Sequence, residues 1–480
     1  MNTRLTDDDV RFDPQSGLDT TGRVFHWKNR VFRGIWADQV TETTRLLDSG
    51  LIEELVATAA FPATWPAELE HPRFGQVLEH ERLTPVTFPH EWSYEMLLDA
   101  GLRILEIEEI ARRHGYSLAD CHPYNVIFHK GEPKFVDLGA FRPVPPGTRG
   151  WKAYESFVQT YLYPLMVWRP GDQYTARLIL SYGTGWPHES YLLYQYSSLR
   201  WLGSIVRRLG QLRGYAYKGR TLDAYPNDFV LENSPAPLLP LVKRAMALNS
   251  KGLLPFQGVH LGRLRRRLES MRSRSYRSEW GGYQDGLFDE TGAALPSPRF
   301  DGIREELVRL GIDSIVELAG NQGTFCRSLL AEGIVSEATC TDGDDGAIDR
   351  LHRENKDRSH AITPAVLDFM NPMGPLHLAR PTERFAADAV LALAVIHHLL
   401  LKPPFYPIDE VLRVIGEYGH RYVVTEFMPK GLHDGRGAPP LPRWYTLEWF
   451  RESFERHFET VTMRPLDEYR TLFIGKKRTG

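Results

Sequence analysis

The chain has 480 residues, of which 42% are hydrophobic and 25% are charged, and its formal net charge is -3. This length predicts two or three domains, and the composition excludes an intrinsically disordered protein. The nearly balanced charge also excludes nucleic-acid binding through bulk electrostatics, so no nucleic-acid partner is expected.

The cysteine content and the apolar segments indicate the cellular compartment in which the protein is expected. The chain has three cysteines, an odd number without metal-ligand spacing, at Cys121, Cys326 and Cys340. Reduced thiols and no bound metal are therefore expected, as in a cytoplasmic protein. The N-terminus has no apolar signal core, and the longest apolar stretch, residues 385–401, contains an aspartate and two histidines. We expect a buried strand and helix there, and no membrane partner.

The first motif lies in the N-terminal half. Asp120 and Asn125 have the D-x-x-x-x-N spacing of a kinase catalytic loop, and a short strand follows that ends in Asp137-Leu-Gly. In kinases the asparagine and the second aspartate hold magnesium, while the first aspartate orients the acceptor hydroxyl. The segment resembles the aminoglycoside and choline phosphotransferases. The resemblance implies an α+β kinase-like domain over residues 1–262.

The N-terminal half departs from that family upstream of the motif. It has neither a G-x-G-x-x-G turn nor a strand of the Val-Ala-Ile-Lys type, and Lys28 and Arg33 are weak substitutes for the kinase lysine. Without these parts a triphosphate has little to hold it. We interpret the domain as a degenerate scaffold, with an active phosphotransferase as the alternative. Residues 151–167 are predicted to form an aromatic-rich helix.

A basic segment, residues 263–274, follows. The pattern favours a solvated helix face or a linker, and the alternative is a clamp for an anionic substrate, because guanidinium groups bind phosphate bidentately. We assign residues 263–300 to a basic linker and to a lead-in, around Trp280 and Tyr283, that closes over a cofactor.

The C-terminal half, residues 301–480, alternates helices with apolar strands. A helix is expected at Ile303–Leu310 and another at Thr324–Glu332. Strands are predicted at Ser314–Leu318, Ala338–Thr341, Thr363–Leu367, Ala387–Ala394 and Tyr422–Glu426, followed by a hairpin of Glu459–Met463 and Arg470–Ile474 around a turn at Pro465–Asp467. Nearly continuous apolar runs between helices indicate a parallel sheet that is covered on both faces.

A glycine turn follows the first of these strands, which ends with Glu317 and Leu318. The turn, residues 319–323, is Ala-Gly-Asn-Gln-Gly. A carboxylate beside the turn disfavours a pyrophosphate and suits an ammonium or a sulfonium group. Asp342 ends the second strand, about 20 residues beyond the turn, where an α/β fold hydrogen-bonds a ribose.

This half resembles the class I S-adenosylmethionine-dependent methyltransferases, and in particular their nodulation-protein-like subgroup. The resemblance implies a Rossmann-like sheet, mostly parallel, with a terminal antiparallel hairpin. It also implies that S-adenosylmethionine is the cofactor and that Asp368 meets its adenine, with Asp344 close enough to compete with Asp342 for the ribose. The implied cofactor-binding residues are Glu317, Ala319, Gly320, Gly323, Asp342, Asp368 and Tyr283.

His397 and His398 follow the fourth strand, beside the position that the resemblance gives to the transferring methyl group. They are candidate catalytic residues, since histidine is the commonest general base. The alternative is a structural histidine pair at the start of a helix. Adjacent helical residues face different ways, so the pair makes a poor joint metal site.

These patterns predict methyl transfer from S-adenosylmethionine to a small-molecule or glycan-type acceptor, at oxygen by analogy with the family. The alternatives are a phosphotransferase that acts through the kinase-like domain and a non-enzymatic binding protein. The sequence leaves the oligomeric state open. A fragment that begins near Met271 is expected to fold and bind cofactor alone, because a domain with its own core can fold independently.

Overall fold

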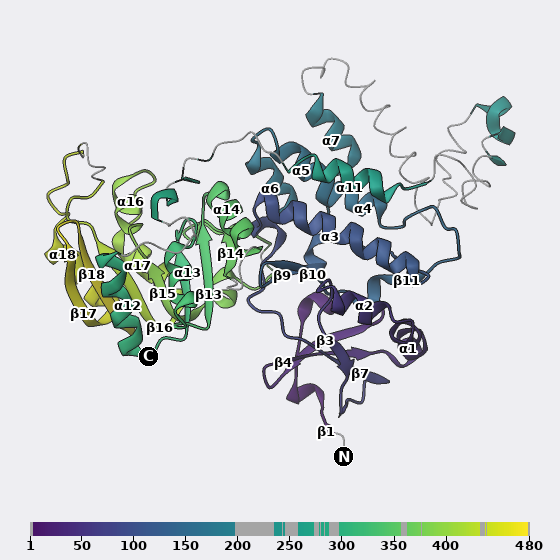
Figure 1. Cartoon of the computed structure of the whole chain (residues 1–480), viewed down its shortest axis with the longest axis horizontal. Helices are drawn as coiled ribbons and strands as arrows, with labels where there is room; N and C mark the ends of the chain where they lie inside the picture. The colour runs from purple at the N-terminus through teal and green to yellow at the C-terminus, as the bar shows by residue number, and fades with distance from the viewer. Residues whose placement is uncertain are drawn as a thin grey trace. The chain divides into compact units, whose positions relative to one another are not determined.

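The computed structural model describes residues 3–196, 235–241, 243–244, 258–272, 278, 280–282, 284–287, 297–356, 362–375, 377–432, 437 and 439–478. The chain is a mixed α/β protein and divides into two compact units (Figure 1). Unit 1 comprises Met1–Thr84, Leu97–Ile127 and Glu132–Ser275, and unit 2 comprises Pro85–Met96, Phe128–Gly131 and Tyr276–Gly480. Among the described residues, no helix is long and apolar enough to cross a membrane.

Unit 2 is built on a seven-stranded sheet in the order β14-β13-β12-β15-β16-β18-β17. Its strands are β12 (Ser314–Leu318), β13 (Glu337–Asp342), β14 (Thr363–Val366), β15 (Ala387–Ala392), β16 (Gly419–Phe427), β17 (Phe458–Asp467) and β18 (Arg470–Lys477). The first five are parallel, whereas β18 is antiparallel to both β16 and β17. The predicted mostly parallel sheet with a terminal antiparallel hairpin is confirmed.

Helices alternate with these strands, as the apolar pattern indicated. They are α12 (Pro298–Leu310), α13 (Thr324–Ala331), α14 (Asp345–Lys356), α15 (Pro381–Arg384), α16 (Ile396–Leu401), α17 (Ile408–Glu417) and α18 (Leu447–His457). The first begins earlier than expected because a proline at its first position is preset for helix. The turn predicted at Pro465–Asp467 lies instead at residues 468–469, since β17 continues to Asp467, whose carboxylate accepts a hydrogen bond from the Tyr469 N–H at 2.7 Å.

Unit 2 also includes a segment from the N-terminal half, residues 85–96, which we call the strap. Arg384 forms a bidentate ion pair with Glu91 of the strap, and their side chains are 7% and 1% exposed. The same guanidinium donates to the Val86 carbonyl and lies over the rings of Phe88 and Phe385, at 4.3 and 4.6 Å from their centroids. The strap is therefore held by a buried charge.

Two further contacts fix the end of the strap. The carboxylates of Asp345 and Asp349, both on α14, accept hydrogen bonds from the backbone N–H groups of Tyr94 and Glu95 at 3.2 and 2.8 Å. His90 lies so close to Gly374 that an added Cβ would come within 2.8 Å of its ring nitrogen. The domain boundaries at residues 262 and 300 remain predictions, but the strap belongs to the same compact unit as the sheet.

Unit 1 begins with a five-stranded antiparallel sheet in the order β2-β3-β4-β7-β5. Its strands are β2 (Arg11–Phe12), β3 (Gly22–Trp27), β4 (Arg30–Ile35), β5 (Thr64–Pro66) and β7 (Gln76–His80), and the helices α1 (Val40–Asp48) and α2 (Leu51–Ala57) lie between β4 and β5 in the chain. A short parallel pair, β1 (Thr3–Arg4) with β6 (Leu69–Glu70), is separate. Stacked phenylalanine rings, Phe25 on Phe32 and on Phe74, lie in the core of this sheet.

The rest of unit 1 is mainly helical. After α3 (Tyr94–Arg113) come the pair β8 (Tyr116–Leu118) and β11 (Phe141–Pro143) and the helices α4 (Tyr154–Phe157), α5 (Tyr163–Trp168), α6 (Gln173–Tyr182) and α7 (His188–Gln195). The hairpin of β9 (Val126–His129) and β10 (Glu132–Phe135) is divided between the units, because Phe128–Gly131 belong to unit 2. The helix expected at 151–167 begins at Tyr154 and contains a π-helical turn, Val158–Leu162. The basic segment forms α11 (Leu261–Glu269). Arg265 and, just beyond the helix, Arg272 pair with Glu109 and Asp99, so the segment packs within unit 1.

Candidate active site

The glycine turn of unit 2 is compact and strained. Ala319, Asn321 and Gly323 all have positive φ angles, of 55°, 55° and 66°. A Cβ at Gly320 would come within 2.7 Å of Cys340 Sγ and 2.9 Å of the Glu317 carboxyl carbon, so only glycine fits. Non-glycine residues in the left-handed region cost about 1 kcal/mol or more each and occur mainly at functional sites.

Asp342 holds this turn in place. One carboxylate oxygen accepts a hydrogen bond from the Asn321 N–H at 2.8 Å, and the other accepts from the Asp344 N–H at 2.7 Å. Burial raises the pKa of Asp342 to about 6. The position at the carboxyl end of β13, one strand from the turn, is the one that the sequence predicted for the ribose-binding acid.

Glu317 lies against the inner side of the turn rather than at an exposed strand end. Its Oε2 accepts a hydrogen bond from the Cys326 thiol at 3.0 Å, and its register partner on β13 is Cys340. Burial raises the pKa of the Glu317 carboxyl to about 7, with the nearby Arg299 opposing this shift. At neutral pH the group is therefore poised between its charged and neutral forms.

The predicted lead-in does meet the turn. The Trp280 N–H donates to Asp344 at 2.9 Å, and its carbonyl accepts from the Asn321 side-chain amide at 3.0 Å. The Gly281 carbonyl accepts from the Gln322 side chain at 3.2 Å. Tyr283, the predicted cofactor contact in this segment, lies outside the described residues.

Gln284 is a site residue that the sequence did not indicate. Its Oε1 accepts hydrogen bonds from the Gln322 N–H at 3.2 Å, the Thr324 N–H at 3.4 Å and the Thr324 hydroxyl at 2.5 Å. Its Nε2 donates to the Gly320 carbonyl at 3.2 Å. One amide thus binds both the glycine turn and the first N–H group of α13, a role that no local motif marks because the partners are distant in sequence.

Asp368 follows β14 and is exposed. One of its oxygens accepts hydrogen bonds from the backbone N–H groups of Met370 and Asn371 at 3.1 and 3.2 Å. These local bonds fix the loop after the strand. Because β14 pairs with β13 in parallel, Asp368 and Asp342 leave the sheet at the same edge, as predicted.

His397 and His398 lie in the first turn of α16, which begins at Ile396 shortly after β15, and their ring centroids are 4.2 Å apart. His397 is buried, its Nδ1 has no hydrogen-bond partner in the described part of the chain, and burial lowers its pKa to about 3. Burial also lowers the pKa of His398, whose ring lies 6.0 Å from Trp280. Since Trp280 also binds the glycine turn, the structure brings His398 and the turn to one site.

A buried ion pair stands beside these groups. Arg299 donates two hydrogen bonds, of 2.7 and 2.6 Å, to the carboxylate of Glu426, near the end of β16. The Glu426 side chain is fully buried. Glu426 was marked in the sequence only as the end of the fifth strand, and Arg299 was missed because its partner is far away in the chain.

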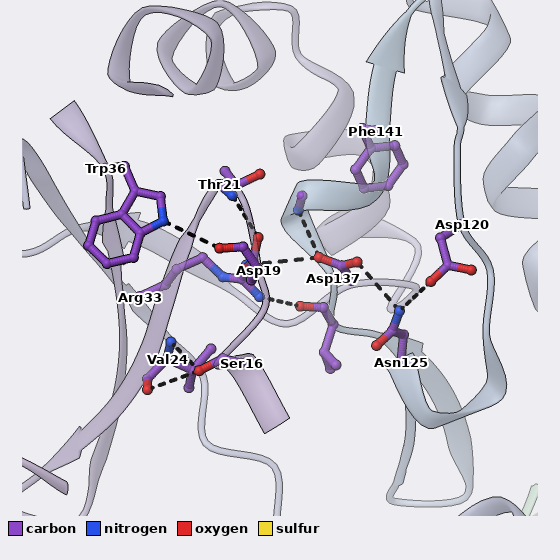
Figure 2. A network of polar contacts seen from close by, with 12 residues as sticks. Ser16, Asp19, Thr21, Val24, Arg33, Trp36, Asp120, Asn125, Asp137 and Phe141 are labelled. Atoms are coloured by element: carbon purple, nitrogen blue, oxygen red, sulfur yellow. Dashed lines mark hydrogen bonds and ion pairs between the residues drawn. The ribbon is translucent and has the colours of Figure 1, made fainter. Parts of the chain in front are cut away.

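The kinase-like loop of unit 1 forms a different cluster, shown in Figure 2. The Asn125 side-chain amide donates to Asp120 at 3.3 Å and to Asp137 at 3.4 Å. The three predicted residues are thus brought together. Burial raises the pKa of Asp137, and the guanidinium of Arg33 opposes that shift.

Arg33 is more than the weak lysine substitute that the sequence predicted. It is buried on β4, pairs with Asp19, and lies 3.8 Å from an oxygen of Asp137. It also donates to the Val136 carbonyl at 3.4 Å. A central strand that carries a cation therefore does precede the helices α1 and α2, although its sequence does not match Val-Ala-Ile-Lys.

The chain is similar to the nodulation protein NoeA of Rhizobium meliloti strain 1021, with 25% identity over 425 residues, which are 86% of this chain and 84% of the relative. No protein-family model matches the chain.

Solved structures that are similar to part of the chain were also found. They include the N-methyltransferase NodS from Bradyrhizobium japonicum WM9, with 15% identity over 38% of this chain and 98% of NodS, and a TM-score of 0.28. NodS has also been solved with S-adenosyl-L-homocysteine, with 14% identity over 42% of this chain and 98% of that chain, at a TM-score of 0.29. A SAM-dependent methyltransferase from Aquifex aeolicus has 12% identity over 41% of this chain and 98% of that chain, and a TM-score of 0.29.

Proposed function

We propose that unit 2 transfers a methyl group from S-adenosylmethionine to a small-molecule or glycan-type acceptor, at oxygen. The observation that carries this proposal is the glycine turn clasped by Asp342 at the carboxyl edge of a sheet whose last strand, β18, is antiparallel. The antiparallel strand separates this sheet from dinucleotide-binding folds, and ligands of parallel sheets bind at that edge.

The residues present fit this cofactor. Asp342 would hold the ribose, Asp368 would meet the adenine amino group, and the turn would receive the methionine part. Glu317 and Asp342 form no ion pair with any described residue, and buried carboxylates of that kind favour a ligand that carries positive charge. Gly320 leaves the backbone free of a side chain where a ligand must approach.

The cofactor supplies an electrophilic methyl group with a neutral leaving group, so the protein mainly aligns donor and acceptor. An oxygen acceptor also has to lose one proton. We propose that His398, the less buried of the pair, takes this proton. His397 stays neutral, because burial holds its pKa at about 3, and would orient the acceptor hydroxyl through a hydrogen bond.

Calorimetry with S-adenosylhomocysteine tests the proposal. We expect binding at micromolar levels, about -8 kcal/mol. Asp342→Ala should weaken it by about 2 kcal/mol or more, the cost of hydrogen bonds to a charged group. Asp388→Ala is the matched control, because Asp388 lies near the amino end of β15, away from the proposed edge. No binding by the unaltered protein, or equal losses in both variants, would reject the site.

Unit 1 supports a second candidate. Asp120, Asn125 and Asp137 meet as the kinase-like resemblance requires, which favours phosphotransfer with the methyltransferase fold as a regulatory or second activity. We favour a degenerate kinase-like scaffold instead, because Arg33 already places a buried cation beside Asp137.

A further inference from the structure

A cluster of soft and hard ligand atoms lies directly beneath the glycine turn. It consists of Glu317 on β12, Cys326 on α13 and Cys340 on β13. The two thiol sulfurs and a carboxylate oxygen all lie within 4.8 Å of one another, and all three residues are buried. It is the one group of three or more such residues that the described part of the chain brings together in this way.

We propose that this cluster is a site for a thiophilic divalent metal ion of the zinc class. Zinc is bound at about 2.3 Å by thiolate and about 2.0–2.2 Å by carboxylate, and three protein ligands with one open position are a common set. Tetrahedral geometry would place the two sulfurs about 3.8 Å apart. The three ligand atoms lie within 4.8 Å of one another, so the two sulfurs would have to approach by at most about 1 Å to reach that separation.

The surroundings also suit a charged centre. Two thiolates, one carboxylate and a divalent ion leave one net negative charge. Arg299 acts electrostatically on Glu317 and Arg327 acts on Cys340, although the two guanidinium groups already pair with Glu426 and Glu354, so they offset only part of that negative charge. The Asn321 carbonyl oxygen accepts a hydrogen bond from the Cys340 thiol, 3.9 Å from its Sγ, and would be released for the fourth position when that thiol loses its proton.

Metal binding here would have to displace protons. Burial raises the pKa of the Cys326 thiol well above its usual value, and the pKa of the Cys340 thiol is also raised. Both are therefore protonated at neutral pH, and each zinc–sulfur bond forms as a sulfur–hydrogen bond breaks and the proton passes to solvent. Two protons, plus any on Glu317, leave for each metal ion bound, so affinity rises with pH.

The position of the cluster has a consequence that rests on the proposed function. The turn closes on the cluster, because a Cβ at Gly320 would touch both Cys340 and Glu317. A metal ion would take the Glu317 carboxylate as a ligand, so that this carboxylate could no longer serve the positively charged part of the cofactor. We infer that zinc and cofactor compete, so that thiophilic metals inhibit the enzyme.

Zinc titration of the reduced full-length protein tests the site, with native mass spectrometry to count bound ions. One zinc ion per chain is expected in the unaltered protein and in Cys121→Ser, whose altered thiol is equally buried but outside the cluster. Cys326→Ser and Cys340→Ser should lose more affinity than the 10- to 100-fold typical of outer-shell partners. Zinc that binds all three variants alike, or no zinc in the unaltered protein, would overturn the proposal.

Two more measurements keep the result clear if a cysteine variant fails to fold. Zinc added to the unaltered protein in weak buffer should release at least two protons per ion, whereas binding to surface histidines releases fewer and would contradict the site. S-adenosylhomocysteine should weaken zinc binding. Zinc binding that depends on the cysteines, without any binding of S-adenosylhomocysteine, would sink the proposed function and leave the metal site standing.

Discussion

The two units gather buried carboxylates in opposite ways. In unit 1, Arg33 lies among Asp19 and Asp137, so the cluster carries its own cation. In unit 2, the described partners of Asp342 and Glu317 are backbone N–H groups and a thiol. Burying a carboxylate without a cation is costly. Unit 1 thus balances its buried carboxylates with its own cation, whereas Asp342 and Glu317 of unit 2 form no ion pair with any described residue, which supports the positively charged ligand that we propose.

Unit 2 nevertheless has two internally paired buried carboxylates, Glu91 and Glu426, and breaking the pair of Arg384 with Glu91 should give the largest effect. Arg384→Met leaves Glu91 charged and buried without its partner, which costs about 3–5 kcal/mol of unfolding free energy. Arg413→Met is the control, because its pair with Glu417 is exposed and worth at most about 0.5 kcal/mol. Urea unfolding of both variants measures the difference, and similar midpoints would show that the strap contributes little.

The strap also revises the expectation for a fragment that begins near Met271. Such a fragment lacks residues 85–96, so Arg384, Asp345 and Asp349 would lose the partners described above. We expect it to be less stable than unit 2 in the full chain and to bind S-adenosylhomocysteine more weakly. Adding the strap as a separate peptide should restore part of the loss, and an unaffected fragment would count against this view.

The next effect tests the turn by adding one methyl group. Gly320→Ala places a Cβ within 3 Å of Cys340 and Glu317, which forces the turn to shift. We expect cofactor affinity to fall by about 2 kcal/mol or more, in line with the 1–3 kcal/mol of overpacking plus lost contacts. Gly343→Ala is the matched control, since its added Cβ meets nothing within 4 Å. Calorimetry distinguishes the two, and equal affinities would remove the turn from the site.

The strands of the unit 2 sheet could be predicted closely from the sequence, whereas the contacts of the strap and of Gln284 could not. The strand at Ser314–Leu318 was predicted to the residue because a continuous apolar run ends at a glycine turn. The edge that collects Asp342, Asp368 and His397 followed from the order of parallel strands. The strap and Gln284 bind residues that are far away in the sequence, so no local sequence pattern reveals these contacts. The thiol cluster depends on the register of Glu317 opposite Cys340, which spacing does not encode.

A smaller effect follows from the pKa values of unit 2. Burial raises the pKa of Asp342 from 3.8 to about 6 and the pKa of Glu317 from 4.5 to about 7. The folded protein therefore holds more protons than the unfolded chain between about pH 4 and pH 7, and this part of its stability is lost as pH rises through that window. Near pH 7 and above, both carboxyl groups are increasingly ionised, so the site then favours a positively charged ligand.

We therefore expect S-adenosylmethionine to bind about tenfold more tightly at pH 8 than at pH 5, or about 1.4 kcal/mol. Glu317→Gln should remove part of this dependence, because the amide cannot titrate whereas Asp342 still does. Asp388→Asn, altered at the other end of the sheet, should keep it. A pH profile that is flat in the unaltered protein would mean that neither carboxylate serves the cofactor.

The smallest expected effect is on nucleotide chemistry in unit 1. Because Arg33 occupies the position beside Asp137, Mg-ATP should be hydrolysed far more slowly than the 1–100 turnovers per second of ordinary kinases. Asp137→Asn should then change ATP turnover little, and Arg33→Met, which removes the cation, is the matched comparison. Phosphate release with a panel of hydroxylated acceptors measures all three proteins. Turnover at kinase rates that disappears with Asp137→Asn would reverse the comparison, since unit 1 would then be a working site despite its own cation.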